Sequence, residues 1–290
     1  SITDRMRELR ELCGGFLVTL VEQEGRMTGL AADQVRELKE CAGSAGLTVA
    51  GGLKTAEEVA ELDAMGCDVQ VGMALYTGAL ELADAFLAPL KKRLGAGPWP
   101  TVVCDDQGLA LGLVWSDRES VQNALESGRG VYHSRRRGLW IKGQESGQIQ
   151  DLLRVDLDCD RDALRFTVRQ HGPGFCHLGC RTCWGDDQGV GRLTRRLAGR
   201  KEDSVPGSYT QRLFQDPDLL QAKLQEEALE LAAARDPDHV AAEAADVLYF
   251  TLVALARSGA TWEDVNRHLD RRAKKVSRRP GNAKPEGWKP

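Results

Sequence analysis

The sequence lacks a long apolar run, a strong excess of either charge, and an apolar leader. Its 290 residues carry a formal net charge of −4, which gives no indication of a nucleic-acid or membrane partner. No apolar stretch approaches the roughly 20 residues of a membrane-spanning helix, and residues 1–15 have no signal-peptide core. We therefore expect a cytoplasmic protein with reduced cysteines, and the length predicts two or three domains.

Three of the eight cysteines lie close together, at Cys176, Cys180 and Cys183. Reduced thiols are available to a metal, and Cys180 and Cys183 have the C-x-x-C spacing that is common in zinc sites. Spacing alone leaves two interpretations open. Four thiolates, with Cys159 as the fourth, would close a structural zinc site, whereas three would leave one position for a water that zinc makes acidic.

The hydrophobic pattern changes twice along the chain. Residues 1–94 alternate strand-like and helix-like runs, which predicts parallel strands, and a Gly/Pro-rich boundary follows at 95–100. Residues 101–185 read as short strands with one helix near 116–126, residues 186–207 as a basic linker, and residues 208–284 as an all-helical domain. The sequence thus predicts a multidomain protein with an α/β segment, a mainly β (α+β) domain and an all-α domain.

Aspartates alternate at Asp158, Asp160 and Asp162. On a strand, residues two apart share a face, so the pattern predicts three carboxylates on one side and Cys159 on the other. Such a cluster repels itself unless a cation offsets the charge, and oxygen ligands favour Mg²⁺ or, in a larger site, Ca²⁺. A solvated acidic turn is the alternative.

The segment 101–184 resembles phosphoribosyl-AMP cyclohydrolase, through motifs at 128–137, 139–147, 158–162 and 174–183. The resemblance implies that zinc is bound by Cys159, Cys176 and Cys183 and magnesium by Asp158, Asp160 and Asp162. It also implies a homodimer in which zinc joins a cysteine of one subunit to two of the other. Cys180 departs from the family pattern, which leaves three or four zinc ligands possible.

The same resemblance implies a reaction. Zinc would supply the hydroxide that adds to C6 of the adenine ring of phosphoribosyl-AMP, after which the N1–C6 bond opens. His177 is the candidate proton shuttle, because imidazole titrates near neutral pH; a structural role beside zinc is equally open. The candidate substrate or phosphate contacts are Arg135, Arg137, Lys142 and Ser146.

Carboxylates recur in the helical segment at helical spacing. Lys223, Glu227 and Glu230 share one helix face, and Glu243 and Asp246 share a face of the next helix. An aspartate within the apolar run 244–250 is costly unless it is paired or metal-bound. Two facing helices would therefore present four carboxylates to Mg²⁺.

The segment 208–284 resembles phosphoribosyl-ATP pyrophosphohydrolase, through 209–213, 223–230, 243–250 and 274–280. The resemblance implies Glu227, Glu230, Glu243 and Asp246 as magnesium ligands, with Glu227 and Asp246 central to catalysis. The candidate phosphate clamps are Lys223, Lys275, Arg278 and Arg279; a solvated helix end is the alternative for the last three.

Residues 1–94 resemble the last part of the (β/α)₈ barrel of the isomerase that acts on the cyclohydrolase product, through 48–52 and 71–78. In that family these loops bind a phosphate. About three strands are readable rather than eight, and neither catalytic aspartate of the family is present, so we expect no isomerase activity. We expect either a longer native chain or a degenerate scaffold completed by a partner. The order of segments is that of the fungal multifunctional histidine enzyme.

We therefore predict a bifunctional hydrolase of histidine biosynthesis that acts on small nucleotides and uses Zn²⁺ and Mg²⁺. One alternative is a non-catalytic, zinc-stapled scaffold or phosphate-sensing subunit. The other is a protein in which only one hydrolase is active.

Overall fold

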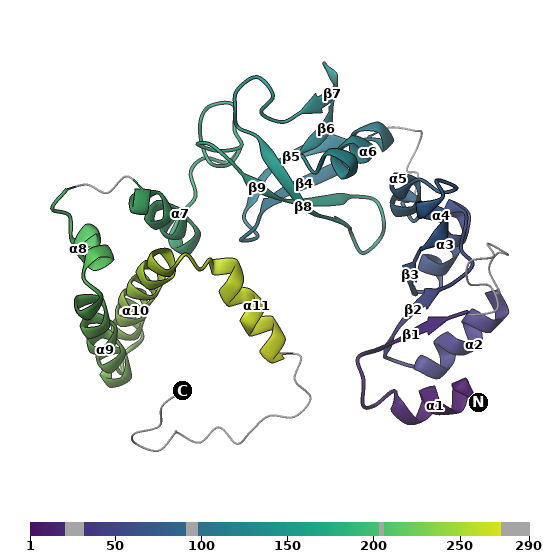
Figure 1. Ribbon diagram of the computed structural model, residues 1–290, viewed down its shortest axis with the longest axis horizontal. Helices are drawn as coiled ribbons and strands as arrows, with labels where there is room; N and C mark the ends of the chain where they lie inside the picture. Colours follow the sequence, from purple (N-terminus) through teal and green to yellow (C-terminus); the bar gives the residue numbers. More distant parts are fainter. Residues whose placement is uncertain (21–31, 91–97, 203–205, 274–290) are drawn as a thin grey trace. The chain divides into compact units, whose positions relative to one another are not determined.

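The computed structural model describes residues 1–20, 32–90, 98–202 and 206–273. These residues form two compact units, Ser1–Gly185 and Asp186–Pro290 (Figure 1). The first unit contains both the N-terminal α/β segment and the sheet-rich central segment. The sequence predicted these as separate domains, at 1–94 and 101–185.

The N-terminal segment has a parallel sheet in the order β1-β2-β3. This confirms the predicted parallel alternation. Buried apolar side chains, among them Leu38, Leu47 and Leu62, pack the helices against the strands. Thr55 caps α3, because its side chain accepts a hydrogen bond from the Glu58 N–H. The elements are α1 (Ile2–Leu9), β1 (Gly15–Thr19), α2 (Ala32–Ala42), β2 (Gly46–Ala50), α3 (Ala56–Ala64), β3 (Asp68–Gln70), α4 (Met73–Tyr76) and α5 (Leu82–Leu87).

The central segment is a six-stranded sheet in the order β7-β6-β5-β4-β9-β8, with β4 and β9 parallel and the other neighbours antiparallel. Tyr132 and Phe166 fill its core, and Leu87 of α5 joins them. The predicted helix and mainly β pattern are confirmed. The elements are β4 (Trp99–Asp105), β5 (Ala110–Ser116), α6 (Arg118–Ser127), β6 (Val131–Ser134), β7 (Gly138–Ile141), β8 (Gln150–Leu157) and β9 (Leu164–Gln170).

The second unit is helical, as predicted. The antiparallel helices α9 and α10 lie side by side, and Leu220, Phe250 and Val253 are buried in the core of the unit (Figure 1). The elements are α7 (Gly189–Glu202), α8 (Tyr209–Gln215), α9 (Pro217–Ala233), α10 (Pro237–Ser258) and α11 (Trp262–Ala273).

Helix α7 corrects one prediction. Residues 186–207 read as a basic linker, yet most of this stretch is helical. Leu193 and Leu197, one turn apart, pack into the core of the helical unit. The many arginines and glycines obscured this short apolar stripe.

Helix α10 corrects the prediction that no apolar stretch approaches the length of a membrane-spanning helix. Its 22 residues are long and apolar enough to cross a membrane by length and composition, although no run was expected to approach that length. Such a helix is weak evidence for a membrane span, because core helices pass the same test. Glu243 and Asp246 lie within α10, and its buried side chains belong to the core of the helical unit.

Candidate active sites

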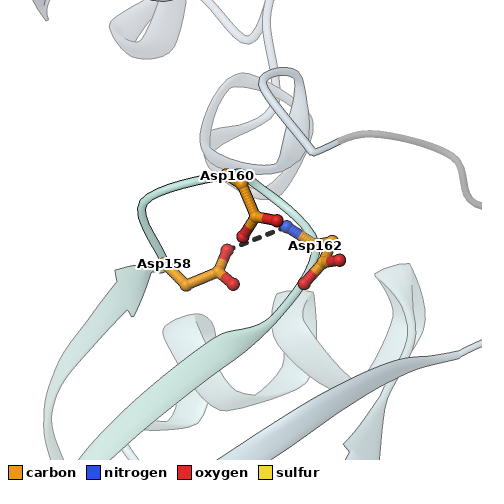
Figure 2. Close-up of side chains that lie close together, drawn as sticks. All are labelled: Asp158, Asp160 and Asp162. Atoms are coloured by element: carbon orange, nitrogen blue, oxygen red, sulfur yellow. Dashed lines mark hydrogen bonds between the residues drawn. The ribbon is translucent and has the colours of Figure 1, made fainter.

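The three aspartates of the central segment meet in the turn between β8 and β9. Carboxylate oxygens of Asp158, Asp160 and Asp162 lie within 4.8 Å of one another. Figure 2 shows the three side chains converging across this turn. The sequence pattern predicted that the three carboxylates share one face of a strand. They do converge, but the strand explanation is wrong, because β8 ends at Leu157. A turn, rather than the alternation of a strand, brings the carboxylates together.

Backbone donors hold one of these carboxylates. Asp158 Oδ1 accepts hydrogen bonds from the N–H groups of Asp162, at 2.8 Å, and Ala163, at 3.1 Å. Burial raises the pKa of Asp158, but the hydrogen bonds from Ala163 and Asp162 outweigh it and leave the pKa below its ordinary value. The group is therefore anionic at neutral pH, and three hard oxygen donors suit Mg²⁺.

The cysteine loop is anchored to the end of the sheet by its backbone. The N–H of Cys183 donates to the Leu111 carbonyl at 2.8 Å, and the N–H of Cys176 donates to the Cys180 carbonyl at 3.2 Å. A Cβ at Gly174 would lie 2.1 Å from the Cys180 carbonyl oxygen, so only glycine permits this close approach. The loop thereby keeps Cys176 and Cys183 near each other.

A buried ion pair fixes the middle of the same loop. Arg181 Nη2 donates to Asp105 Oδ2 at 2.8 Å, and the Asp105 side chain is fully buried. Asp105 Oδ1 accepts from the N–H groups of Gln107 and Leu109. The pair therefore joins the end of β4 to the cysteine loop.

The thiols of two predicted zinc ligands, Cys176 and Cys183, lie close enough to interact. Desolvation of the Cys183 thiol raises its pKa, and the charge and hydrogen bond of Cys176 raise it further. Cys159 is exposed on the carboxylate turn. Within the described residues of this single chain, Cys159 does not form a three-ligand cluster with the other two.

A pocket of about 680 Å³ lies beside these thiols, a volume typical of small-molecule sites. Lys142 is buried in its wall, with Nζ 5.2 Å from the centre of the Phe175 ring. Burial lowers the pKa of Lys142, and the neighbouring Cys183 and Cys176 oppose that shift. The pocket thus combines two thiols, an aromatic wall and a buried amine.

The other predicted contacts divide into two groups. Arg137, Ser146 and His177 line the pocket, and His177 Nδ1 lies 4.0 Å from Cys176 Sγ. The guanidinium of Arg135 instead lies over the Trp115 ring at 5.8 Å, and Arg135 is not among the pocket-lining residues. Cys180 is not among them either.

The helical unit brings a second carboxylate cluster together. Oxygens of Glu227 and Glu230, on α9, and Glu243, on α10, lie within 4.8 Å of one another. Partial desolvation and repulsion from Glu227 and Glu243 raise the pKa of Glu230. Mutual repulsion of this kind is what a bound cation relieves.

Asp246 and Lys223 belong to the predicted site of the same unit. Asp246 is exposed and lies outside the cluster, so its apolar neighbours in sequence do not bury it in this chain. Lys223 Nζ contacts Glu226 and Glu227, each at 2.8 Å, and these hydrogen bonds raise the pKa of the lysine. Lys275, Arg278 and Arg279 lie outside the described residues.

Sequence reasoning missed Asp105, Arg181 and His239. His239 Nε2 lies 3.1 Å from Glu243 Oε1, one helical turn away on α10, a spacing that could have identified it. No local signal links Asp105 to Arg181, because the two are 76 residues apart.

Three family models match the chain in succession. Residues 1–81 match a model described as histidine biosynthesis protein, residues 112–185 match phosphoribosyl-AMP cyclohydrolase, and residues 190–273 match phosphoribosyl-ATP pyrophosphohydrolase. The last match includes α7, in agreement with its packing in the helical unit.

Curated relatives cover the chain to different extents. The histidine biosynthesis bifunctional protein his7 of Schizosaccharomyces pombe is 47% identical over 71% of this chain, and the trifunctional protein of Neurospora crassa is 46% identical over 73%. The matches span 49% and 25% of those two proteins, so the chain covers about half the length of one and a quarter of the other. The bifunctional protein HisIE of Parasynechococcus marenigrum is 36% identical over 65% of this chain and 94% of its own length.

Proposed function

Because this chain belongs to the family of bifunctional histidine biosynthesis proteins of the HisIE type, we propose that it catalyses two successive hydrolyses. In the first, water cleaves phosphoribosyl-ATP to phosphoribosyl-AMP and pyrophosphate. In the second, water adds to C6 of the adenine ring and the N1–C6 bond opens, which gives ProFAR. The helical unit would carry out the first reaction and the sheet-rich segment the second.

The carboxylate cluster of α9 and α10 supports the first activity. Glu227, Glu230 and Glu243 form a donor set that fits Mg²⁺, and Asp246 would complete it when substrate or a second subunit closes the site. The ion pairs of Lys223 keep the Glu227 carboxylate in place. Lys275, Arg278 and Arg279 remain the proposed phosphate contacts.

The pocket beside the two thiols carries the proposal for the second activity. Cys176 and Cys183 offer thiolate donors that fit zinc, with Cys159 of a partner subunit as the proposed third ligand. Arg137, Ser146 and the buried Lys142 would bind the anionic substrate, and Arg135 would act at the edge of the site. His177 would carry a proton from the attacking water towards the ring nitrogen.

The metals would divide the chemistry between them. When bound, zinc would lower the pKa of a coordinated water, and magnesium at both carboxylate clusters would neutralise phosphate charge. The Asp158, Asp160 and Asp162 turn supplies the oxygen donors for magnesium in the central segment. We also propose a homodimer with shared zinc, a cytoplasmic location, and no isomerase activity from residues 1–94.

Turnover of phosphoribosyl-ATP by the purified chain with Zn²⁺ and Mg²⁺ tests this function. Pyrophosphate and the ring-opened product should be followed separately, and both are expected. Pyrophosphate alone would refute the cyclohydrolase half and favour a closed zinc site. Neither product from metal-replete protein would refute the bifunctional assignment in favour of a scaffold.

A further inference from the structure

Arg161 connects the carboxylate turn to the N-terminal segment. Its guanidinium contacts Asp63 of α3 through two nitrogens, Nη2 to Oδ1 at 2.6 Å and Nε to Oδ2 at 3.0 Å. Its third nitrogen, Nη1, donates to the Asp158 carbonyl at 2.7 Å. One side chain therefore spans from a helix of the N-terminal segment to the backbone of the turn.

The backbone of Arg161 adopts a conformation that needs such support. Its φ is 62°, and among the described non-glycine residues only Arg161 has a positive φ. This left-handed region is unfavourable for a residue with a Cβ, so surrounding contacts must hold the Arg161 backbone in it. Arg161 lies between Asp160 and Asp162, and its backbone conformation helps to set the directions in which these two carboxylates point.

Asp63 is also unusual in its own helix. It lies in the last turn of α3, where the helix dipole disfavours a negative charge and where α3 has no basic residue. The Arg161 guanidinium, 98 residues away in sequence, supplies the missing positive charge. Both side chains are partly shielded, with 32% of Arg161 and 22% of Asp63 exposed, so solvent weakens the pair less than it weakens a fully exposed one.

We propose that Asp63 is a positioning residue for the carboxylate turn, and that the N-terminal segment supports the central site through the Asp63–Arg161 contact. This inference rests on the proposed function, because it assumes that the turn of Asp158, Asp160 and Asp162 binds a divalent cation. It gives residues 1–94 a role that requires no isomerase chemistry.

A second ion pair between the same two segments provides a matched control. Arg118, at the start of α6, contacts Asp84 of α5 through Nε at 2.6 Å and Nη2 at 2.8 Å. This pair does not involve the carboxylate turn. Asp84→Asn therefore removes one bidentate contact between the segments without touching the turn, whereas Asp63→Asn removes the other.

Hydrogen exchange of the full chain, with and without Mg²⁺, tests the proposal. The reporters are the amides of Asp162 and Ala163, which donate to Asp158 Oδ1. In D63N, their exchange without Mg²⁺ should be faster, and the Mg²⁺ concentration for half protection should rise about fivefold, on the scale of a partly buried ion pair. D84N should match the unmodified chain.

Arg161→Gly provides the coupling test, because glycine adopts a positive φ without strain but cannot contact Asp63. D63N should have no further effect in the R161G background. Equal behaviour of D63N and D84N, or an additive effect of D63N in R161G, would overturn the inference alone. A lack of Mg²⁺ protection in the unmodified chain would overturn the proposed cation site and this inference with it.

Discussion

Replacing Asp105 with asparagine would remove a negative charge from beside the buried Arg181 while keeping the shape of the side chain. Asp105 is fully buried, and Arg181 is 8% exposed. Removing one member of a buried ion pair typically costs about 3–5 kcal/mol, because the remaining charge stays desolvated. The asparagine oxygen can still accept the N–H groups of Gln107 and Leu109, but its NH2 group then faces the Arg181 Nη2 donor, so we expect a loss of at least about 3 kcal/mol.

This loss is measurable in urea. The free energy of unfolding of the sheet-rich segment should be followed by hydrogen exchange in peptides from β4 and β9, which report on that sheet alone. D105N should shift its unfolding equilibrium about a hundredfold. The buried Cys176 thiol should also react faster with a thiol reagent, because Arg181 lies in the same loop.

Arg129→Gln is the matched control. Its partner Asp151 lies at 2.9 Å, but the two side chains are 45% and 37% exposed, so the cost should stay below about 1 kcal/mol. The double variant Asp105→Asn with Arg181→Met removes both charges, keeps an acceptor for the N–H groups of Gln107 and Leu109, and should be more stable than D105N. If D105N cost no more than R129Q, the ion pair would not be what holds the cysteine loop.

Three further predictions concern the two sites and the α6 cap. Cys180→Ser should leave zinc content and ring opening nearly intact, whereas Cys183→Ser should lose zinc; equal losses by elemental analysis would establish a four-thiolate site. Asp246→Ala should abolish pyrophosphate release but spare ring opening from supplied phosphoribosyl-AMP, and retained release would remove Asp246 from the metal site. Burial raises the pKa of Asp117, but hydrogen bonds from Ser120 and His133 outweigh it and lower the pKa. Its contribution to stability is therefore present above about pH 4 and lost as the pH falls through the lowered folded-state value. Asp117→Asn keeps the cap and should flatten the acid limb of a stability–pH curve, and an unchanged limb would contradict this assignment.

The positions of several helices and strands could be predicted well from the sequence. The helix expected near 116–126 is α6, and the parallel alternation expected over 1–94 is present in β1, β2 and β3. Asp117 caps the N-terminus of α6 through its side chain. These features depend on side chains within a few positions of one another, and short-range hydrogen bonds and apolar periodicity determine them. The sequence did not predict α7, because its apolar periodicity is weak. Only two leucines among its arginines and glycines pack into the core of the helical unit.

The chemistry of the sites was partly determined in the same way. Residue type and spacing identified the group of thiols over 176–183 and the carboxylates of Glu227 and Glu230, because metals select donor atoms and a helix turn sets a short spacing. Only the family resemblance selected Cys176 and Cys183 among those thiols. The carboxylates of Asp158, Asp160 and Asp162 were identified for the wrong geometric reason. A turn closed by backbone hydrogen bonds brings them together, and alternation in sequence does not distinguish a turn from a strand.

Only the tertiary structure decided which distant groups meet. Arg181 and Asp105 are 76 residues apart, Arg161 and Asp63 are 98 apart, and Glu243 joins Glu227 from a neighbouring helix. The exposure of Asp246 also follows from packing, although its neighbours in sequence are apolar. Each of these depends on how complete elements pack against one another, which residue patterns within one element do not specify.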